Sequence, residues 1–574
     1  MKTKWAAVLL STGLLLAVEA LAAEYVFEVG GVPLRFRING SLRLSENLVD
    51  NTWTLGMGND IGVFQGDSHR EFARQTGLQY EIPMSLTSGE NFELFLRLQR
   101  LGRADYAPII ESNRYVTLFG EVPTYDLDEM LPRIRTMYVD VPVVDVGVPV
   151  RVRAGLIPYV VGGAYALGGK YEQYGVDLYN REGPVTLRLH YDRPDLVSGT
   201  YLGIGPPEAE RGTRDDADGD FFAGDLSNEA KLGPVTLDTQ LYAGLLRDET
   251  RGSMRQTGKT RRAVPIFSGT ETDLDNLWTA GLAAGVRIGD LILRVEGARN
   301  FGEAESRLAG VPDIEHTGWM TVAQAAYVWG IVTPRVKFLY TSSNSFSKSD
   351  LARFFGNPAG TANDIIFKPR KANRAFSVYS PTNEKFLDSH YSKALGPLVA
   401  TAAGYAVNFG IPRPGTFGDP HILENLMLVN GGVDLPLTRR LTLGLDYYYM
   451  RAVEAGYGIP TDLNNPAQFL PAILHQRAFP LSPDLGHELD LTAKFRLHRN
   501  VTIGLQTGVF LPGEYYRERR HPTDVAANPF SRTVRGFTDT TTRGNCTSAS
   551  TGPCRAVRNP DPAYVVELGL QLEF

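Results

Sequence analysis

The chain ends with the stretch AYVVELGLQLEF, which runs from Ala563 to Phe574. Its apolar side chains recur at every second position: Tyr564, Val566, Leu568, Leu570, Leu572 and Phe574. The intervening positions from residue 567 onwards are polar or small: Glu567, Gly569, Gln571 and Glu573. Because successive side chains of a strand point to opposite faces, this alternation predicts a strand with one apolar and one polar face.

A carboxy-terminal strand that ends on an aromatic residue resembles that of bacterial outer-membrane β-barrel proteins. The resemblance implies that the barrel assembly machinery is a partner and reads Phe574, together with Tyr564, as an assembly signal. A half-buried strand of a soluble protein would show the same alternation. The prediction therefore depends on whether the rest of the chain repeats the pattern.

The amino-terminal residues predict export. Lys2 and Lys4 precede an apolar run from Trp5 to Val18, and the small residues Ala20 and Ala22 follow. This is the order of a positively charged region, an apolar region and a cleavage site, so residues 1–22 are expected to be a cleaved signal peptide. The apolar run is shorter than the ~20 residues that a membrane-spanning helix needs. Residues 23–574 are expected to form one domain.

The composition agrees with a barrel. The chain has 574 residues, of which 43% are hydrophobic, and a formal net charge of −6. After the signal peptide no run of 18 apolar residues occurs, whereas a barrel in lipid needs an apolar residue only at every second position. The 26 tyrosines suit interfacial aromatic girdles. The charge is not basic enough to predict a nucleic-acid partner.

Further segments repeat the alternation of the last strand. The first runs over residues 34–44, where apolar residues alternate with Arg35, Arg37 and Arg43. Eight hairpins follow: 78–86 with 92–98, 133–141 with 150–156, 174–179 with 185–191, 222–232 with 235–246, 278–288 with 291–299, 319–329 with 335–341, 427–435 with 441–450, and 489–497 with 501–511. With the terminal strand they make about 18 strands.

The connections alternate in length. Hairpin partners are joined by a few residues, such as Gly233-Pro234, whereas successive hairpins are joined by long segments such as 101–132 and 247–277. Short periplasmic turns and long extracellular loops are typical of outer-membrane barrels, and a soluble sandwich or propeller would not need them. The predicted fold is all-β: a transmembrane antiparallel up-and-down barrel in the bacterial outer membrane, surrounded by membrane lipid and lipopolysaccharide.

A barrel of about 18 strands is wide enough to hold an aqueous lumen. The longest loop, residues 342–426, contains an apolar piece rich in glycine and alanine, residues 395–411. This loop could fold inward as a constriction or stay outside as a lid, and the sequence leaves both alternatives open.

The polar faces of the strands predict the pore lining. Arginines gather on the earlier strands and carboxylates on the later ones: Arg35, Arg37, Arg43, Arg97, Arg133, Arg135, Arg151, Arg153 and Arg188, and then Asp446, Glu488, Asp490 and Glu567. A basic arc that faces an acidic arc would put a transverse field across the pore and orient anionic or dipolar solutes. The alternative is that these charges neutralise one another as solvated pairs.

Three stretches extend the resemblance to a particular family. They are LRLSEN at residues 42–47, RTMYVDV at 135–141, and RVRAGLI at 151–157 before Gly162-Gly163. Together they resemble the alginate-export-type porin family, which implies an 18-stranded barrel and, as in its type member, an arginine-lined pore for an anionic polysaccharide. This chain has Gly155-Leu156-Ile157 where that pattern expects Gly-Arg-Gln. The resemblance therefore carries over only the arginines, as pore-lining residues.

Two smaller features of the sequence have the residue types of a metal site and of a disulfide. Asp216, Asp218 and Asp220 have the alternating spacing of calcium loops, although Phe221 stands where such a loop has glycine. Calcium is the only cofactor that the sequence brings into question. Cys546 and Cys554, the only two cysteines, are expected to form a disulfide in an exported chain.

Three classes of function are compatible with this fold. The favoured one is a porin-like passive channel for small anionic or dipolar solutes, and no catalytic motif predicts an enzyme. The second is a barrel sheath around a lumenal or periplasmic protein partner, such as a multihaem cytochrome. The third is an export pore for an anionic polysaccharide.

Overall fold

The structure of the protein is a computed structural model. It describes residues 23–50, 72–89, 92–100, 114–117, 120–123, 133–145, 149–157, 159, 161–163, 167, 173–180, 183, 185–192, 219–248, 252–253, 271–306, 314–315, 318–342, 426–453, 457–458, 479–480, 482–514, 533–539, 545–547, 554–556 and 562–574.

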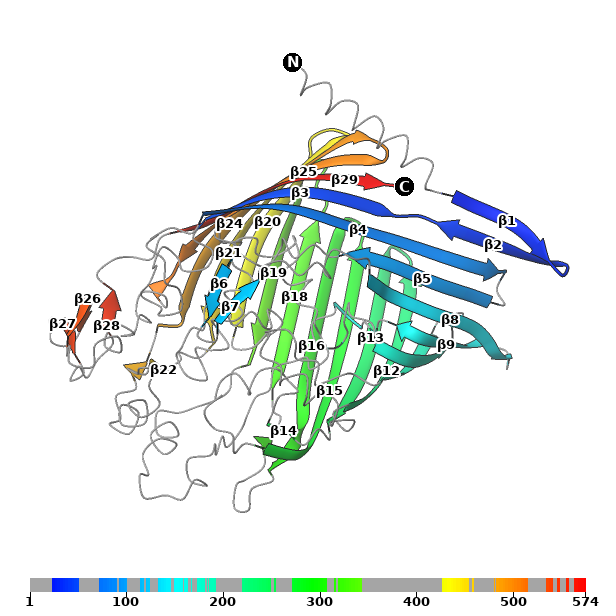
Figure 1. The fold of residues 1–574 in the computed structure, drawn as a ribbon, viewed down its shortest axis with the longest axis horizontal. Helices are drawn as coiled ribbons and strands as arrows, with labels where there is room; N and C mark the ends of the chain where they lie inside the picture. Colours follow the sequence, from blue (N-terminus) through cyan, green and yellow to red (C-terminus); the bar gives the residue numbers. More distant parts are fainter. Residues whose placement is uncertain are drawn as a thin grey trace.

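The long strands form one closed antiparallel ring of 18 strands (Figure 1). Each strand of the ring pairs with the next, and the last, β29, pairs with the first, β3. The ring consists of β3 Ser41–Asp50, β4 Phe72–Ser88, β5 Phe92–Arg100, β8 Arg133–Asp145, β9 Pro149–Ile157, β10 Gln173–Asn180, β11 Val185–Asp192, β12 Gly219–Leu232, β13 Val235–Asp248, β15 Glu271–Ile288, β16 Leu291–Ser306, β18 Trp319–Tyr327, β19 Thr333–Thr341, β20 Leu426–Pro436, β21 Leu441–Ala452, β24 Asp484–His498, β25 Val501–Pro512 and β29 Ala563–Glu573. The predicted fold and strand number are confirmed.

Shorter strands add to the ring or lie apart from it. They are β6 Arg114–Thr117, β7 Gly120–Pro123, β14 Gly252–Ser253, β17 Ile314–Glu315, β22 Tyr457–Gly458, β23 Phe479–Pro480, β26 Thr533–Asp539, β27 Asn545–Thr547 and β28 Cys554–Ala556. Of these, β14 pairs with β15 and β17 with β16, whereas the others form small separate sheets. Among the described residues, no helix is long and apolar enough to cross a membrane.

The strand β11 shows how the alternation builds the wall. Leu187, Leu189 and Tyr191 are exposed on the outer face, whereas the alternate residues His190 and Asp192 are buried on the inner face. Exposed apolar side chains recur on the outer face around the ring, as a barrel wall in contact with lipid requires. A closed barrel with an apolar exterior, short turns at one rim and long connections at the other belongs in the bacterial outer membrane.

The amino-terminal end of the barrel differs from the prediction. Instead of one strand that begins near residue 34, the chain forms a hairpin of β1 Ala23–Val29 and β2 Val32–Ile38. Gly30 and Gly31 make its turn with φ of 60° and 83°, a conformation that glycine adopts without strain. β2 continues into β3, and both pair with β4 in the same register.

The hairpin extends the wall beyond the closed ring. β29 ends beside β3 where the backbones of Phe574 and Gly40 exchange two hydrogen bonds, at 2.7 and 2.8 Å. β29 pairs with β3 from Ser41 onwards, whereas β1 pairs with β2 up to Ile38, so β1 continues the sheet where β29 ends. In Figure 1 the hairpin accordingly projects past the carboxyl terminus. It lies at the rim of the short turns, which is the periplasmic rim.

The terminal aromatic residue closes the seam of the barrel. Phe574 packs against the buried pair Val501 and Leu572, as do Leu42 and Leu570, and a Cβ added to Gly40 would lie 2.5 Å from the Phe574 ring. Deletion of Phe574 should therefore lower the assembled fraction several-fold and remove about 1–2 kcal/mol of packing from the seam. The fraction that migrates differently on gels before and after heating measures assembly. Gly40→Val crowds the Phe574 ring but keeps the carboxyl terminus, and it is the comparison variant. Wild-type assembly of the Phe574 deletion would contradict the predicted assembly signal.

Candidate functional site in the barrel lumen

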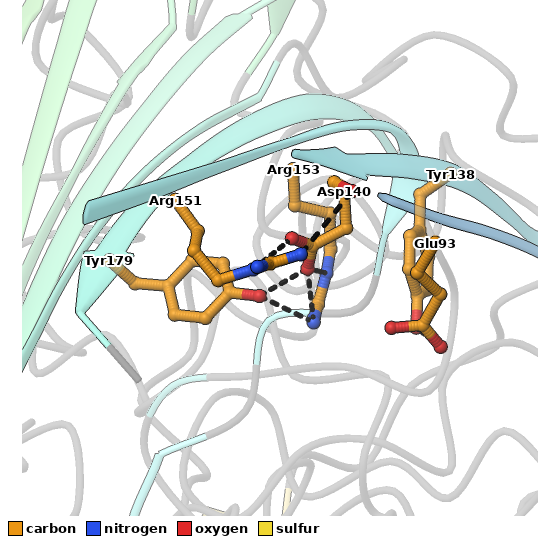
Figure 2. A network of polar contacts seen from close by, with 6 residues as sticks. All are labelled: Glu93, Tyr138, Asp140, Arg151, Arg153 and Tyr179. Atoms are coloured by element: carbon orange, nitrogen blue, oxygen red, sulfur yellow. Dashed lines mark hydrogen bonds and ion pairs between the residues drawn. The ribbon is translucent and has the colours of Figure 1, made fainter. Parts of the chain in front are cut away.

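The candidate site begins with one carboxylate on the lumen side of β8. Asp140 is fully buried and accepts hydrogen bonds from two arginines of β9 (Figure 2). Arg151 donates through Nε at 2.6 Å, and Arg153 donates through Nε at 3.1 Å and Nη2 at 3.0 Å. The Tyr179 hydroxyl of β10 donates to the same carboxylate. Two guanidinium groups on one carboxylate leave an excess of one positive charge in this cluster.

Strand pairing explains why these residues meet. The register sets Asp140 opposite Arg153, and Arg153 opposite Asp177 on β10. Arg151 is likewise opposite Tyr179. Residues that face one another across antiparallel strands share one face of the sheet. The Asp140 cluster is therefore a continuous polar surface over three strands.

Aromatic rings extend this surface sideways. The Arg97 guanidinium lies 5.6 Å from the centre of the Phe95 ring, and Phe95 stacks on Tyr138 with ring centres 5.1 Å apart. The Arg153 guanidinium lies 4.4 Å from the centre of Tyr138 and 5.1 Å from that of Tyr179. We call Arg97, Phe95, Tyr138, Arg153 and Tyr179 the arginine–aromatic ribbon.

The ribbon offers both charge and flat apolar surface. The Arg153 side chain keeps 24% of its surface exposed, and the Arg97 side chain keeps 35%. Cationic planes next to aromatic faces suit solutes that carry a negative group on a ring or another flat apolar body. Figure 2 shows Glu93 beside Tyr138, whose hydroxyl is 3.5 Å from the nearer carboxylate oxygen.

A histidine clamp adjoins the Asp140 cluster on β11. The His190 Nδ1 lies 2.6 Å from Asp177 Oδ1, and its Nε2 lies 2.7 Å from Asp192 Oδ2. Each ring nitrogen thus faces a carboxylate oxygen, which accepts hydrogen bonds when it is ionised. The Tyr159 ring stacks on it at 4.6 Å, and Phe221 packs edge-on against both.

Tyr159 belongs to a segment that folds into the lumen after β9. Its described residues are 159, 161–163 and 167, which we call the inner segment; Tyr159, Val161 and Leu167 are buried. Burial raises the pKa of the Tyr159 hydroxyl, which therefore stays neutral. The Arg188 guanidinium lies 4.4 Å from the centre of the Tyr159 ring.

The inner segment is anchored to wall strands that are not neighbours of β9. The Gly162 amide donates to Gln240 Oε1 of β13 at 2.7 Å, and the Gly163 amide donates to Glu296 Oε2 of β16 at 2.5 Å. Tyr242 of β13 donates to the other oxygen of Glu296 at 2.8 Å. The segment thus crosses part of the lumen and narrows it. Sequence reasoning missed Tyr159, Gln240 and Glu296, although the pair Gly162-Gly163 was a signal of a close backbone approach.

The later strands carry the predicted carboxylates. Asp446 of β21 is ion-paired with Arg335 of β19 at 2.5 Å and accepts a hydrogen bond from Asn430 at 3.1 Å. Glu488 and Asp490 of β24 are buried on the same face, and the register sets Asp490 opposite Asp446. Each arc thus contains both signs of charge, so the two arcs are not segregated in the described residues.

Most of the other predicted arginines also have a carboxylate partner. Arg43 is paired with Glu567 and thereby ties β3 to β29. The remaining pairs are Arg97 with Glu81 at 3.2 Å, Arg188 with Asp225 at 2.9 Å, and Arg35 and Arg37 with Glu24 at 3.1 Å each. Since Arg35 and Arg37 lie on β2, they belong to the hairpin below the closed ring and do not line its lumen.

Several predicted residues lie wholly or partly outside the described residues. The side chains of Arg133 and Arg135 lie outside the described residues. In the backbone, a register shift between β5 and β8 falls at Arg135. Asp216 and Asp218 also lie outside the described residues, whereas Asp220 accepts a hydrogen bond from Tyr191 at 2.9 Å. No group of three or more metal-ligating side chains occurs in the part of the chain that the structure describes, and calcium stays a prediction.

Most of the longest loop and the cysteine side chains also lie outside the described residues. Of the loop 342–426, residues 343–425 lie outside the described residues. The backbones of Cys546 and Cys554 lie on β27 and β28, on either side of β26, and their side chains are outside the description. The disulfide stays a prediction, as does the signal peptide over residues 1–22. Tyr564 is exposed on the outer face of β29.

No protein-family model matches the chain, and no curated protein does either. Solved structures with similarity include OprD from Pseudomonas aeruginosa, at 11% identity over 94% of this chain and 95% of that one, with a TM-score of 0.39. OpdK from Pseudomonas aeruginosa has 9% identity, coverage of 94% and 98%, and a TM-score of 0.42. OmpT of Vibrio cholerae has 9% identity, coverage of 96% and 100%, and a TM-score of 0.32. At such low values the fold rests on the strand pairing itself, and the resemblance to the alginate-export-type family stays a prediction.

Proposed function

We propose that the protein is a porin-like passive channel for small anionic or dipolar solutes. The observation that carries this proposal is the Asp140 cluster, in which two arginines share one carboxylate on the lumen wall. Arg153 is the more exposed of the two, so it offers its charge to the lumen while Arg151 holds the carboxylate.

The position of the inner segment supports a selective channel rather than an open sheath. It reaches from the end of β9 to Gln240 and Glu296 and occupies lumen space between these walls. A sheath around a folded partner needs that space clear. In a narrowed lumen, a wall charge acts on a passing solute at short range, where solvent and salt screen it least.

The selectivity can be tested with paired variants. Arg97→Gln with Arg153→Gln removes two exposed charges from the ribbon, and Arg151 continues to neutralise Asp140. In planar bilayers under a salt gradient near 0.1 M, where the Debye length is about 10 Å, the reversal potential should move toward cation preference. At 1 M, where that length falls to about 3 Å, the difference should nearly vanish.

The hairpin provides a matched control. Arg35→Gln with Arg37→Gln removes the same charge from the same face of the wall but outside the closed ring. Its reversal potential should stay at the wild-type value. A shift in the control as large as in the ribbon variant, or no shift in the ribbon variant, would contradict the proposal. A very large, unselective wild-type conductance would instead favour the sheath.

A further inference from the structure

Among the described residues, exposed arginines occur on the outer face of the wall as well as on the lumen face. Arg299 of β16 is exposed, and the register places it beside Trp319 of β18 and Ala280 of β15, both on the outer face. Among the described residues its guanidinium has no ion-pair or hydrogen-bond partner. A charge on the lipid face is costly unless an anion meets it there.

Arg299 lies at the level of an aromatic girdle near the long-loop rim. Trp278 and Phe301 stack with ring centres 6.1 Å apart, and Trp319 stacks on Tyr340 at 4.6 Å. Trp278, Phe301 and Trp319 are exposed on the outer face. Aromatic residues gather where lipid tails meet headgroups, so these stacks mark the outer interface of the membrane on this part of the barrel.

The geometry of β16 also places Arg299 near the outer interface of the membrane. Arg299 follows Leu291, the first residue of β16 after the short turn, by eight residues. At ~3.3 Å per residue and a tilt of ~40°, it stands roughly 20 Å above that turn, near the top of an apolar band about 25 Å tall. Tyr327 and the neighbouring Trp329, both exposed, mark the opposite edge of the band at the short-turn rim.

The surroundings leave the guanidinium open from one side. Trp319 flanks it on β18, and the Trp278–Phe301 stack lies beyond it toward the long-loop rim. On the other side the register places only Ala280, and behind it Ala243 of β13. Gly297, two residues earlier on β16, also lacks a side chain that could cover Arg299.

We propose that Arg299 and the flanking stacks Trp278–Phe301 and Trp319–Tyr340 bind a phosphate group of an outer-leaflet glycolipid. The guanidinium fork matches phosphate oxygens and replaces the missing counter-ion. The aromatic faces suit the sugar ring that carries the phosphate, and the exposed Val295 and Leu293 below provide an apolar path for its acyl chains. The long-loop rim faces the outer leaflet, which selects a glycolipid over an inner-leaflet phospholipid.

Native mass spectrometry of the full-length protein in detergent tests the proposal. The probes are bisphosphorylated lipid A, its dephosphorylated form, and phosphatidylglycerol. The wild type should bind bisphosphorylated lipid A at least tenfold more tightly than the dephosphorylated form, since a charge-assisted phosphate contact is worth about one order of magnitude or more. It should also bind phosphatidylglycerol less tightly than bisphosphorylated lipid A, because that phospholipid has no sugar ring for the aromatic faces. Arg299→Gln should lose that preference, and Arg299→Lys should keep part of it.

Arg294→Gln is the matched control, because Arg294 lies on the inner face of the same strand, two residues before Glu296. It should bind like the wild type. Equal binding of the two lipid A forms by the wild type, an equal loss in Arg294→Gln, or full retention in Arg299→Gln would each overturn the proposal. Equal binding of phosphatidylglycerol would overturn the assignment to a glycolipid. The comparison of lipids on the wild type decides the matter even where Arg299→Gln fails to assemble.

Discussion

Replacing Asp140 by alanine is expected to destabilise the barrel by about 3–5 kcal/mol, more than any other single substitution on the described lumen wall. The change leaves Arg151, which is almost fully buried, and Arg153 without their shared anion. It also leaves the Tyr179 hydroxyl without its acceptor. The temperature at which the heat-resistant gel band is lost measures the effect.

Two comparison variants separate the buried charge from simple loss of a carboxylate. Asp434→Ala removes a partly exposed partner of Arg335, which keeps Asp446, and should cost less than about 1 kcal/mol. Asp140→Leu with Arg151→Leu removes the buried pair together and should recover much of the loss. If Asp140→Ala lowers the stability no more than Asp434→Ala does, solvent reaches the cluster and hydrates the arginine charges that remain there.

The barrel could be predicted because each strand carries the evidence for its own orientation. In β11 the letters V-T-L-R-L-H-Y-D already separate outer from inner side chains, and the hairpin turns are short enough to fix the register. The hairpin of β1 and β2 was missed although Tyr25, Phe27 and Val29 alternate and Gly30-Gly31 marks a turn. Its position directly after the expected cleavage site concealed it.

The lumen site shows the limit of counting every second residue. On β8, strict alternation sets Arg133 and Arg135 on one face and Asp140 on the other. The structure has a register shift at Arg135, after which Thr136 and Asp140 are both buried. A bulge inserts one residue and exchanges the two faces of the strand. Since nothing in RTMYVD announces it, the partner of Arg151 and Arg153 could not be predicted.

The anchors of the inner segment were beyond sequence reasoning for another reason. Glu296 is 133 residues from Gly163 in the chain, and it joins Gly163 only because β16 faces the end of β9 across the lumen. A glycine with φ of 54° at position 162 fits that approach, since an added Cβ would lie 2.7 Å from the Glu296 carboxylate. The pattern of the strands gives the wall but not the contacts across the lumen.

Removing these anchors is expected to widen the channel. Glu296→Ala with Gln240→Ala deletes the acceptors of the Gly163 and Gly162 amides, so the inner segment loses its hydrogen bonds to β16 and β13. The packing of Tyr159 on His190, Phe221 and Arg188 still holds the beginning of the segment. Single-channel conductance in 1 M salt should rise roughly twofold, because the obstruction leaves the lumen while the wall stays closed.

High salt makes this test specific for obstruction. Loss of Glu296 also removes a negative charge, which alters ion concentrations in the lumen at low salt, but at 1 M the Debye length is only about 3 Å. Asp238→Ala removes the same charge from the lumen face of β13 without touching the inner segment, and its conductance at 1 M should match the wild type. If the double variant also matches the wild type, the limiting constriction lies elsewhere in the lumen. If Asp238→Ala rises equally, the effect is electrostatic and the inner segment does not narrow the pore.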